Sequence, residues 1–324
     1  MRIAVTGSIA TDHLMTFPGK FADLLMPDKL DKVALSFLVD TLEIRRGGVA
    51  ANISFGLGCL GQQPLLVGSV GPDFGEYRSW LQAHGVDTAG VRESTLAHTA
   101  RFINTTDQHG AHIGSFYTGA MAEDSRIDLG AVAAQAGPID LVLVGSGDPE
   151  AMLRFTTQCR ELGIAFANDT SWQVARMDGE GVRALIDGAD YLFANEYEAA
   201  LTEQKTGWDA AEIISRVKVR VTTLGQDGSR VDRAGEPPLL VPAVEVEPRE
   251  TTGAGDAFRA GFLAAVSAGF GLERATQLGN LIAACALETV GPQEYEFKPE
   301  PLTARFGAAY GDAAAADLAS LLDA

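Results

Sequence analysis

The most specific local pattern in this sequence is the stretch from Glu250 to Phe258, E-T-T-G-A-G-D-A-F. The apolar residues after it recur at helical spacing as far as Val266, so the stretch is predicted to end in a helix. The first N–H groups of a helix lack internal partners and carry the positive end of its dipole. Because Gly253 and Gly255 have no side chains, a phosphate can approach those N–H groups closely. The turn therefore predicts an anion-binding site.

Asp256 is unexpected in such a turn, because a carboxylate repels a phosphate. We interpret it as the base that takes a proton from a hydroxyl group attacking the phosphorus. The plain alternative is a loop-to-helix turn in which an N-terminal acid favours the helix dipole. The full string is far more specific than Gly-Ala-Gly-Asp alone, which favours the catalytic interpretation.

Composition excludes several classes of protein. The 324 residues can bury a large core, and 46% apolar with 21% charged residues is typical of a globular protein. A formal net charge of −18 repels nucleic acid and anionic membranes, so neither is expected as a partner. Cys59, Cys159 and Cys285 are far apart and predict neither a disulfide nor a metal site. No secretory signal and no membrane-spanning run is recognisable, so we expect a cytoplasmic protein.

Apolar runs alternate with helical patterns along most of the chain. Strands are predicted at 2–6, 65–70, 141–144, 164–167, 191–193, 217–222, 229–232 and 239–246, and helices at 51–60, 74–84, 149–162, 179–186, 196–203 and 272–288. Strands that alternate with helices form parallel, doubly wound sheets. Two segments, about 10–48 and 99–118, break this rhythm with short strand-like pieces of mixed polarity at 33–39, 41–44, 99–106 and 111–117.

The signature from Glu250 to Phe258 resembles that of the ribokinase-like, PfkB-type carbohydrate and nucleoside kinases. The resemblance implies an α/β fold with a doubly wound, mostly parallel sheet flanked by helices. It implies one domain over residues 1–324, with a small β-lid from about 10–48 and 99–118 covering the substrate. Gly253, Ala254 and Gly255 would form the anion hole for the transferring phosphoryl group, and Asp256 would be the general base. Glu250 departs from the family, which has Asp there.

A second glycine-rich stretch, R-R-G-G-V-A-A-N at 45–52, lies between a strand-like piece and a helix. Alone it is typical of a plain turn or a hinge, because glycine absorbs φ/ψ changes at little cost. Together with the C-terminal signature it resembles the family's N-terminal signature, in which the diglycine with Gly48 serves the lid and Asn52 contacts a substrate hydroxyl. The nearby G-x-G-x-x-G at 56–61 ends a helical pattern instead of following a strand, so we interpret that dinucleotide-type match as accidental.

The resemblance also implies an ATP site. Asn195 and Glu198 match an N-x-x-E motif that acts on the magnesium–phosphate arrangement, with Glu198 reaching Mg²⁺ through water; alone, they are an ordinary helix cap. Thr223, Gly225 and Gly228 match the T-x-G-x-x-G segment that lines the ATP site. Asn280 falls near the place where the family packs adenine. ATP and Mg²⁺ are therefore expected, and the family's monovalent cation sites leave dependence on K⁺ open.

The acceptor site is predicted at the other end of the chain. Asp12 follows the first strand, where parallel sheets place ligand contacts, and a carboxylate accepts two hydrogen bonds from paired ribose hydroxyls. Phe102 and Phe116 fall in the lid segments and are either packing residues or a sandwich for a purine. The strings at 4–15, 35–39 and 98–102 resemble the mycobacterial-type adenosine kinases of actinobacteria. In that branch, the positions that correspond to ten residues of this chain surround the nucleoside. They are Ser8, Asp12, Ser36, Gly48, Asn52, Phe102, Phe116, Gln173, Arg176 and Asp256.

One residue departs from that branch, which has Gln where this chain has Trp172. We expect the indole to change which base is accepted. The sequence thus predicts transfer of the γ-phosphoryl group of ATP to the 5′-hydroxyl of a purine nucleoside, with adenosine to AMP in purine salvage as the first choice. A homodimer joined through the lid is expected. The alternatives are a kinase of a sugar or another nucleoside, a non-catalytic nucleoside sensor, and a dinucleotide-dependent oxidoreductase.

Overall fold

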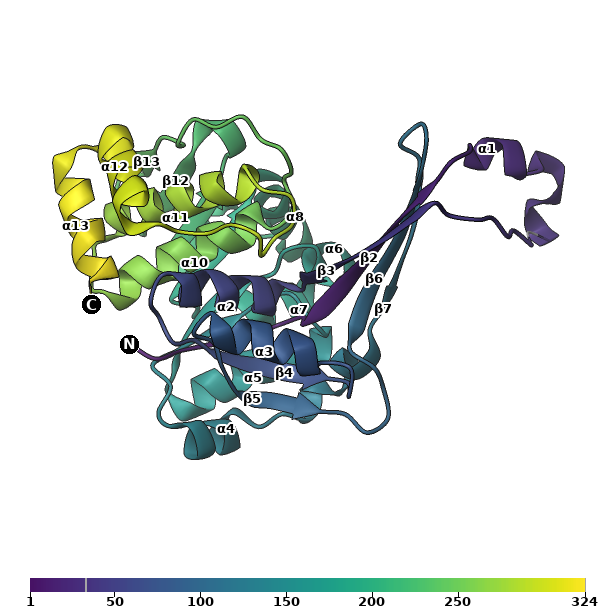
Figure 1. Ribbon diagram of the computed structural model, residues 1–324. Helices are drawn as coiled ribbons and strands as arrows, with labels where there is room; N and C mark the ends of the chain where they lie inside the picture. The colour runs from purple at the N-terminus through teal and green to yellow at the C-terminus, as the bar shows by residue number, and fades with distance from the viewer. Residues whose placement is uncertain (33, 324) are drawn as a thin grey trace.

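A large sheet forms the centre of the molecule in this computed structural model, which describes residues 1–32 and 34–323 (Figure 1). Its nine strands lie in the order β13-β12-β11-β10-β9-β8-β1-β4-β5. They are β1 (Ile3–Thr6), β4 (Leu65–Val70), β5 (Asp87–Glu93), β8 (Leu141–Val144), β9 (Ala165–Asp169), β10 (Tyr191–Asn195), β11 (Val219–Thr223), β12 (Ser229–Asp232) and β13 (Leu239–Val241). From β11 to β5 every pair is parallel, whereas β12 pairs antiparallel with both its neighbours.

Helices cover both faces of this sheet. Along β1, Ile3 and Val5 enter one core and Ala4 enters the other, as the two-residue period of a strand requires. The first core is covered by α2 (Val49–Cys59), α3 (Gly75–Ala83), α10 (Ala254–Ser267), α11 (Leu272–Leu287), α12 (Pro299–Tyr310) and α13 (Asp312–Leu322). The second is covered by α4 (Leu129–Ala136), α5 (Pro149–Leu162), α7 (Gly179–Ile186), α8 (Glu196–Thr206) and α9 (Ala210–Arg216). The predicted doubly wound α/β class is confirmed.

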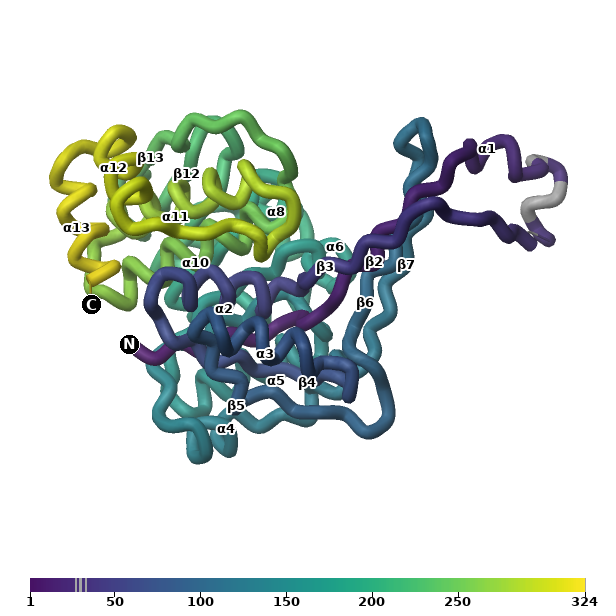
Figure 2. The backbone as a smooth tube through the Cα atoms, viewed as in Figure 1, coloured from purple at the N-terminus to yellow at the C-terminus, as the bar shows by residue number. Residues whose placement is uncertain are grey.

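A second sheet of four strands, in the order β3-β2-β6-β7, projects from the body (Figures 1 and 2). Its strands are β2 (Ala10–Phe17), β3 (Thr41–Gly47), β6 (Ala100–Asp107) and β7 (His112–Tyr117). β2 pairs antiparallel with β3 and parallel with β6. We call this sheet the lid. The chain ends in α13, on the side of the body away from the lid (Figure 2).

The tip of the lid differs from the sequence prediction. Instead of a strand at 33–39, residues 34–39 have no regular structure, and Val33 lies outside the described residues. Phe37 packs against Phe17 at the end of β2 and against Phe21 in the short helix α1 (Phe21–Leu24), with ring centroids 4.9 and 5.3 Å apart. This aromatic contact holds the segment by side chains, so strand pairing is not needed. The strand predicted at 239–246 is also shorter than expected: β13 begins at Leu239 and ends at Val241.

The glycine match at 56–61 serves helix packing. Gly56 lies inside α2, where a Cβ would come within 2.6 Å of the Ala260 Cβ on α10. A Cβ on Gly58 would lie 1.9 Å from the carbonyl oxygen of His84. These glycines therefore allow close approach of neighbouring chain segments, which removes the basis for a dinucleotide site. In the part of the chain that the structure describes, no helix is long and apolar enough to span a membrane.

Candidate active site

The predicted anion turn opens helix α10. Gly253 is the N-cap, with a φ of 80°, and a Cβ on it would lie 2.5 Å from the Pro292 Cβ. A Cβ on Gly255 would lie 2.7 Å from Nη1 of Arg259. Gly253 is therefore restricted to glycine by the contact with Pro292 and by its left-handed backbone, whereas a side chain at position 255 would displace the Arg259 guanidinium. The first N–H groups of a helix are suited to bind an anion, and in this turn the Ala254 N–H also donates to the carbonyl oxygen of Thr251 at 3.3 Å.

Asp256 lies in the first turn of α10. Its carboxylate accepts a hydrogen bond from Nδ2 of Asn52 at 2.8 Å. Burial raises the pKa of Asp256 to about 6, against the opposing effects of the Arg259 guanidinium and of the Asn52 hydrogen bond. A carboxylate with a raised pKa is a better proton acceptor than a free one while remaining ionised at neutral pH.

A buried chain of hydrogen bonds orients Asn52. Nε2 of Gln293 lies 2.9 Å from Oδ1 of Asn52 and 2.5 Å from the hydroxyl of Tyr77. That hydroxyl donates to the carbonyl oxygen of Gly47 at 2.9 Å. Gly47 is the last residue of lid strand β3, so this series of hydrogen bonds connects the diglycine at the end of the lid with Asp256. The sequence did not predict Gln293 or Tyr77, because nothing in the two motifs marks them.

Asp12 lies at the base of the lid. In the sheet register it stands opposite Arg45 of β3 and Phe102 of β6. Burial raises the pKa of Asp12 to about 6; the neighbouring Arg45 acts in the opposite direction. Gly47 and Gly48 allow the backbone to pack closely around Asp12 and Ser8. A Cβ on Gly47 would lie 2.9 Å from Oδ2 of Asp12, and one on Gly48 would lie 2.5 Å from the Ser8 carbonyl oxygen.

Glu250, the residue that departs from the family pattern, is tied to the lid. Its Oε2 accepts hydrogen bonds from Nη1 of Arg45 at 2.9 Å and from the backbone N–H of Gly291 at 3.0 Å. The glutamate therefore bridges the signature loop and lid strand β3. The extra methylene relative to aspartate supplies reach for this contact.

Exposed aromatic side chains stand beside Asp12. Phe102 and Phe116 are cross-strand partners and so share the lid face that carries Asp12. They form one wall, which corrects the idea that they enclose a base between them. Trp172 from the body lies across from the lid, with its ring 6.2 Å from that of Phe116 at 63°. Arg176 places its guanidinium carbon 5.5 Å from the centroid of the Trp172 ring.

Three further residues were predicted for the site of the acceptor substrate, and two of them, Gln173 and Ser8, make hydrogen bonds within the protein. Gln173 is buried and donates through Nε2 to the carbonyl oxygen of Gly147, which fixes the loop that carries Trp172. Oγ of Ser8 accepts from the N–H of Val49 at 2.9 Å, at the start of α2. Ser36 is exposed and adjoins Phe37 at the lid tip, so the structure does not bring it together with Asp12 within one chain.

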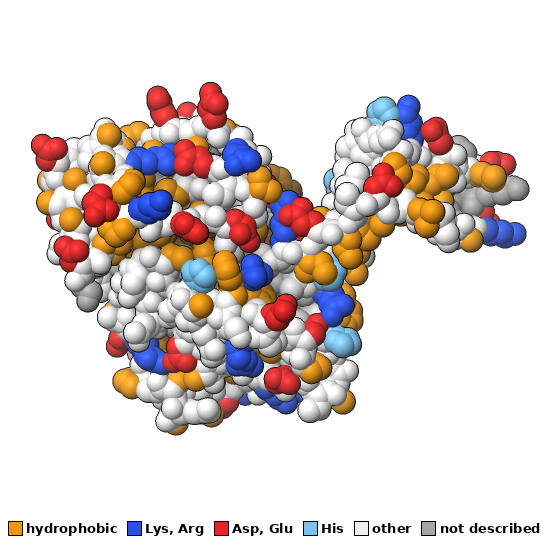
Figure 3. Space-filling model, viewed as in Figure 1, with side chains coloured by type: hydrophobic (Ala, Val, Ile, Leu, Met, Phe, Trp, Pro, Cys, Tyr) orange, Lys and Arg blue, Asp and Glu red, His pale blue; other side chains and the backbone are white. Residues whose placement is uncertain are grey.

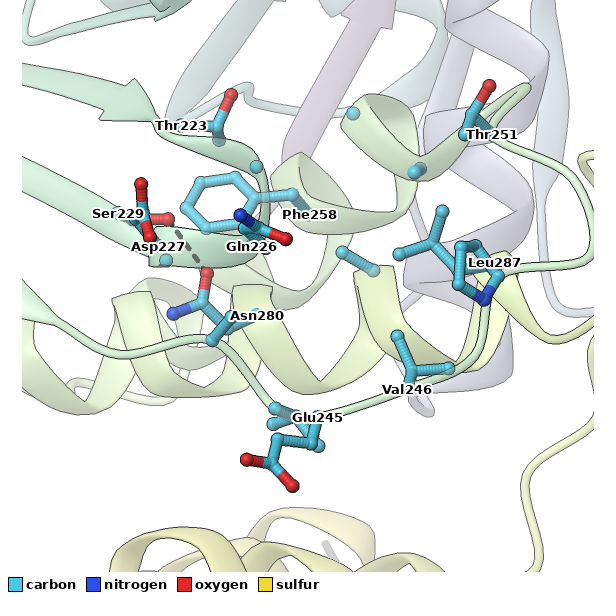
Figure 4. Close-up of a pocket in the computed structure, with 18 of the residues that line it drawn as sticks. Thr223, Gln226, Asp227, Ser229, Glu245, Val246, Thr251, Phe258, Asn280 and Leu287 are labelled. Atoms are coloured by element: carbon cyan, nitrogen blue, oxygen red, sulfur yellow. Dashed lines mark hydrogen bonds between the residues drawn. The ribbon is translucent and has the colours of Figure 1, made fainter.

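A cavity of ≈1210 Å³ lies beside the anion turn (Figure 4). Thr223, Gly225, Gly228 and Asn280, which the sequence predicted for the ATP site, all line it. Its walls include the ring of Phe258 and, on another side, Val246 and Leu287 (Figure 4). The Asn280 side chain is part of the wall, since Oδ1 accepts from the Ser229 hydroxyl at 2.7 Å and Nδ2 donates to the Pro242 carbonyl oxygen at 3.0 Å.

A smaller cavity of ≈310 Å³ adjoins it, and the two share Thr223 and Gly255. Asn195, Glu198, Asp256 and Arg259 line this smaller cavity. Asn195 and Glu198 form a capping box, each side chain accepting from the other's backbone N–H at 2.8 Å. Among the described residues no group of three or more His, Cys, Asp or Glu could hold a metal. A Mg²⁺ ion held mainly by phosphate and water would need few protein ligands, and Glu198 could then contact it through water.

A glycine turn suited to bind an anion thus lies beside a partly buried carboxylate, where a large cavity meets a smaller one, and this arrangement suits phosphoryl transfer. The pfkB family carbohydrate kinase model matches residues 13–298, and the chain belongs to this family. The fold is ribokinase-like. The family and its relatives make the protein a nucleoside or sugar kinase.

Several relatives are kinases of nucleosides or sugars. The chain is 26% identical over 257 residues to a nucleoside kinase from Methanocaldococcus jannaschii, covering 76% of this chain and 80% of the relative. It is 28% identical over 301 residues to the ribokinase from Bacillus subtilis, covering 90% and 94%. The structure of Burkholderia thailandensis nucleoside kinase in complex with inosine has a TM-score of 0.82 and 32% identity, covering 96% of this chain and 98% of that one.

Proposed function

We propose that the protein transfers the γ-phosphoryl group of ATP to the 5′-hydroxyl of a purine nucleoside, with adenosine to AMP as the first choice, in purine salvage in the cytoplasm. The observation that carries the proposal is the position of Asp256. It stands between a nucleotide-sized cavity and a lid face that presents Asp12 together with exposed aromatic rings. This arrangement suits a substrate with a flat base, a sugar diol and a primary hydroxyl.

Each residue then has a chemical task. Asp12 accepts hydrogen bonds from the ribose hydroxyls, which holds the 5′-oxygen near Asp256. Asn52 keeps the Asp256 carboxylate oriented at 2.8 Å, and Asp256 takes the proton of the attacking hydroxyl. The N–H groups of the turn stabilise the charge on the transferring group. Mg²⁺, when bound with ATP near Asn195 and Glu198, would neutralise part of the phosphate charge.

A purine is favoured by the aromatic wall. Phe102, Phe116 and Trp172 are 36%, 38% and 40% exposed, so beside Asp12 their rings together form an apolar surface that a ligand can cover. A purine offers a large face for such rings, whereas a free sugar offers none. The inosine complex of the Burkholderia thailandensis enzyme supports a purine nucleoside as the acceptor class.

The test is kcat/KM for adenosine, inosine, guanosine, uridine, ribose and fructose with ATP. We expect the purine nucleosides to be best. Because a stacked contact contributes about 0.5–1.5 kcal/mol beyond area burial, Phe102→Ala and Phe116→Ala should each raise the nucleoside KM by about 2–10-fold with little change for ATP. Tyr117→Ala is the matched control, since Tyr117 adjoins Phe116 on the opposite face of β7. A free sugar as the best substrate would instead support a sugar kinase, with the lid aromatics as packing residues.

We also propose that the outer face of the lid joins a second copy of this chain. Opposite the face of Asp12 and Phe102, Leu42, Ile44 and Ile113 are 58%, 58% and 49% exposed. Hydrophobic side chains gather along the projecting lid (Figure 3). Light scattering should therefore give a dimer that Ile44→Glu converts to a monomer, whereas Leu162→Glu on α5 should leave the dimer intact. A monomeric wild type would contradict this proposal.

A further inference from the structure

We propose that Arg259 stabilises the negative charge of the transferring phosphoryl group, and that Asp169 is the residue that positions it. The inference rests on the proposed kinase function and adds a charged group to its site. Arg259 follows Asp256 by one turn of α10, and its side chain is 8% exposed. It lines the smaller cavity together with Gly253, Gly255 and Asp256.

The guanidinium lies directly against the anion turn. A Cβ built on Gly255 would be 2.7 Å from Nη1 of Arg259, so this edge of the group occupies the space beside the Gly255 backbone. An anion bound by the N–H groups of the turn would therefore lie next to Nη1. The planar fork of arginine matches phosphate oxygens in two-point contacts, and it stays charged even when buried.

Asp169 holds the opposite edge of the guanidinium. Its Oδ1 accepts from Nη2 of Arg259 at 2.6 Å, and its side chain, at the end of β9, is 1% exposed. Burial raises the pKa of Asp169 to about 7, and the adjacent guanidinium acts in the opposite direction. With Nη2 fixed in this way, rotation of the guanidinium is restricted and Nη1 stays at the turn.

A purely structural ion pair would not account for the position of Arg259. Buried ion pairs seldom stabilise a fold relative to apolar residues, because desolvation offsets their attraction. Among the described residues Nε of Arg259 and Oδ2 of Asp169 are buried without hydrogen-bond partners, so the pair is incompletely satisfied. Glu198 and Asp256, which share the cavity, would repel an incoming phosphate. Arg259 is the side chain lining the cavity that can offset them.

The test compares two buried arginines. Arg259→Ala should lower kcat by about 10²–10³-fold, the range for loss of one charge-stabilising donor, while calorimetry gives an unchanged affinity for the nucleoside. Arg220→Ala is the matched control: Arg220 is 7% exposed, pairs with Glu203 at 2.9 Å, and lines neither cavity. It should lower the thermal midpoint and leave kcat unchanged. Asp169→Asn should lower kcat by a smaller factor, again without loss of nucleoside affinity.

Chemical rescue separates charge stabilisation from a structural role. Guanidinium chloride at millimolar concentration should restore part of the kcat of Arg259→Ala and should not restore Asp256→Asn. If Arg259→Ala does not fold, the same measurements apply to Arg259→Gln. A folded variant with the kcat of the wild type, or a loss of kcat that guanidinium does not restore, would overturn the proposal. A wild type that phosphorylates nothing in the substrate panel would instead overturn the proposed function.

Discussion

Asp256→Asn is expected to lower kcat by about 10²–10⁴-fold, which is the usual contribution of a positioned general base. Asparagine has nearly the same shape and can still accept the hydrogen bond that Asn52 donates at 2.8 Å, so the site should keep its geometry. Nucleoside affinity, measured by calorimetry, should therefore change little. The loss then reports the missing proton acceptor and not a disturbed binding site.

The pH dependence gives this prediction a second readout. Burial raises the pKa of Asp256 to about 6, and only the ionised carboxylate accepts a proton. At saturating nucleoside, kcat of the wild type should fall by about tenfold per pH unit below that pKa. The residual kcat of Asp256→Asn should lack this dependence.

Stability should change in the opposite direction to activity. The folded pKa of Asp256 lies above its ordinary value of 3.8, so protonation of this group stabilises the fold at low pH, and that contribution is lost as the pH rises through about 6. Asp256→Asn should therefore raise the thermal midpoint at pH 7.5, and the gain should diminish towards pH 4.

The matched control is Asp312→Asn, which removes a carboxylate from the first turn of α13, outside both cavities. It should leave kcat and its pH profile unchanged. If Asp256→Asn turned over at nearly the wild-type rate, proton transfer would belong to another group and the assignment of Asp256 would be wrong.

The central sheet could be predicted from the sequence because its strands are continuous apolar runs between clear helices. The predicted ranges 65–70, 141–144 and 229–232 coincide with β4, β8 and β12. Strand β5, Asp87–Glu93, was missed, because its edge position leaves an interrupted pattern in which Ala89, Arg92 and Glu93 are exposed. In the lid, the predicted strands at 99–106 and 111–117 lie within one residue of β6 and β7, whereas β2 was missed because its mixed polarity hides the two-residue period.

The contacts that assemble the site could not be predicted. Asn52 and Gln293 are 241 residues apart in the chain, and Arg45 and Glu250 are 205 apart. No local pattern encodes such pairs, because the tertiary fold alone brings them together. Arg259 had a local signal, since its spacing of three residues from Asp256 places both on neighbouring positions of one helix face.

Asp12→Ala is expected to weaken nucleoside binding by at least about 10–150-fold, because each hydrogen bond to a charged acceptor contributes roughly 1.5–3 kcal/mol. ATP affinity should stay unchanged, since Asp12 lies on the lid and lines neither the large cavity nor the smaller one. The substitution should not leave an unpaired cation. Arg45, the charge opposite Asp12, keeps its contacts with Glu43 and Glu250 at 2.7 and 2.9 Å.

Isothermal titration with adenosine and with a non-hydrolysable ATP analogue measures both affinities. Thr11→Ala is the matched control, because Thr11 precedes Asp12 on the same strand and its side chain points to the opposite face. Burial raises the pKa of Asp12 to about 6, so the wild-type affinity for adenosine should also weaken as the pH falls through 6, whereas the affinity of Asp12→Ala should not. Equal losses for the nucleoside and the ATP analogue would place Asp12 outside the ribose site, since a residue that contacts the sugar and lines neither cavity has no contact through which to weaken donor binding.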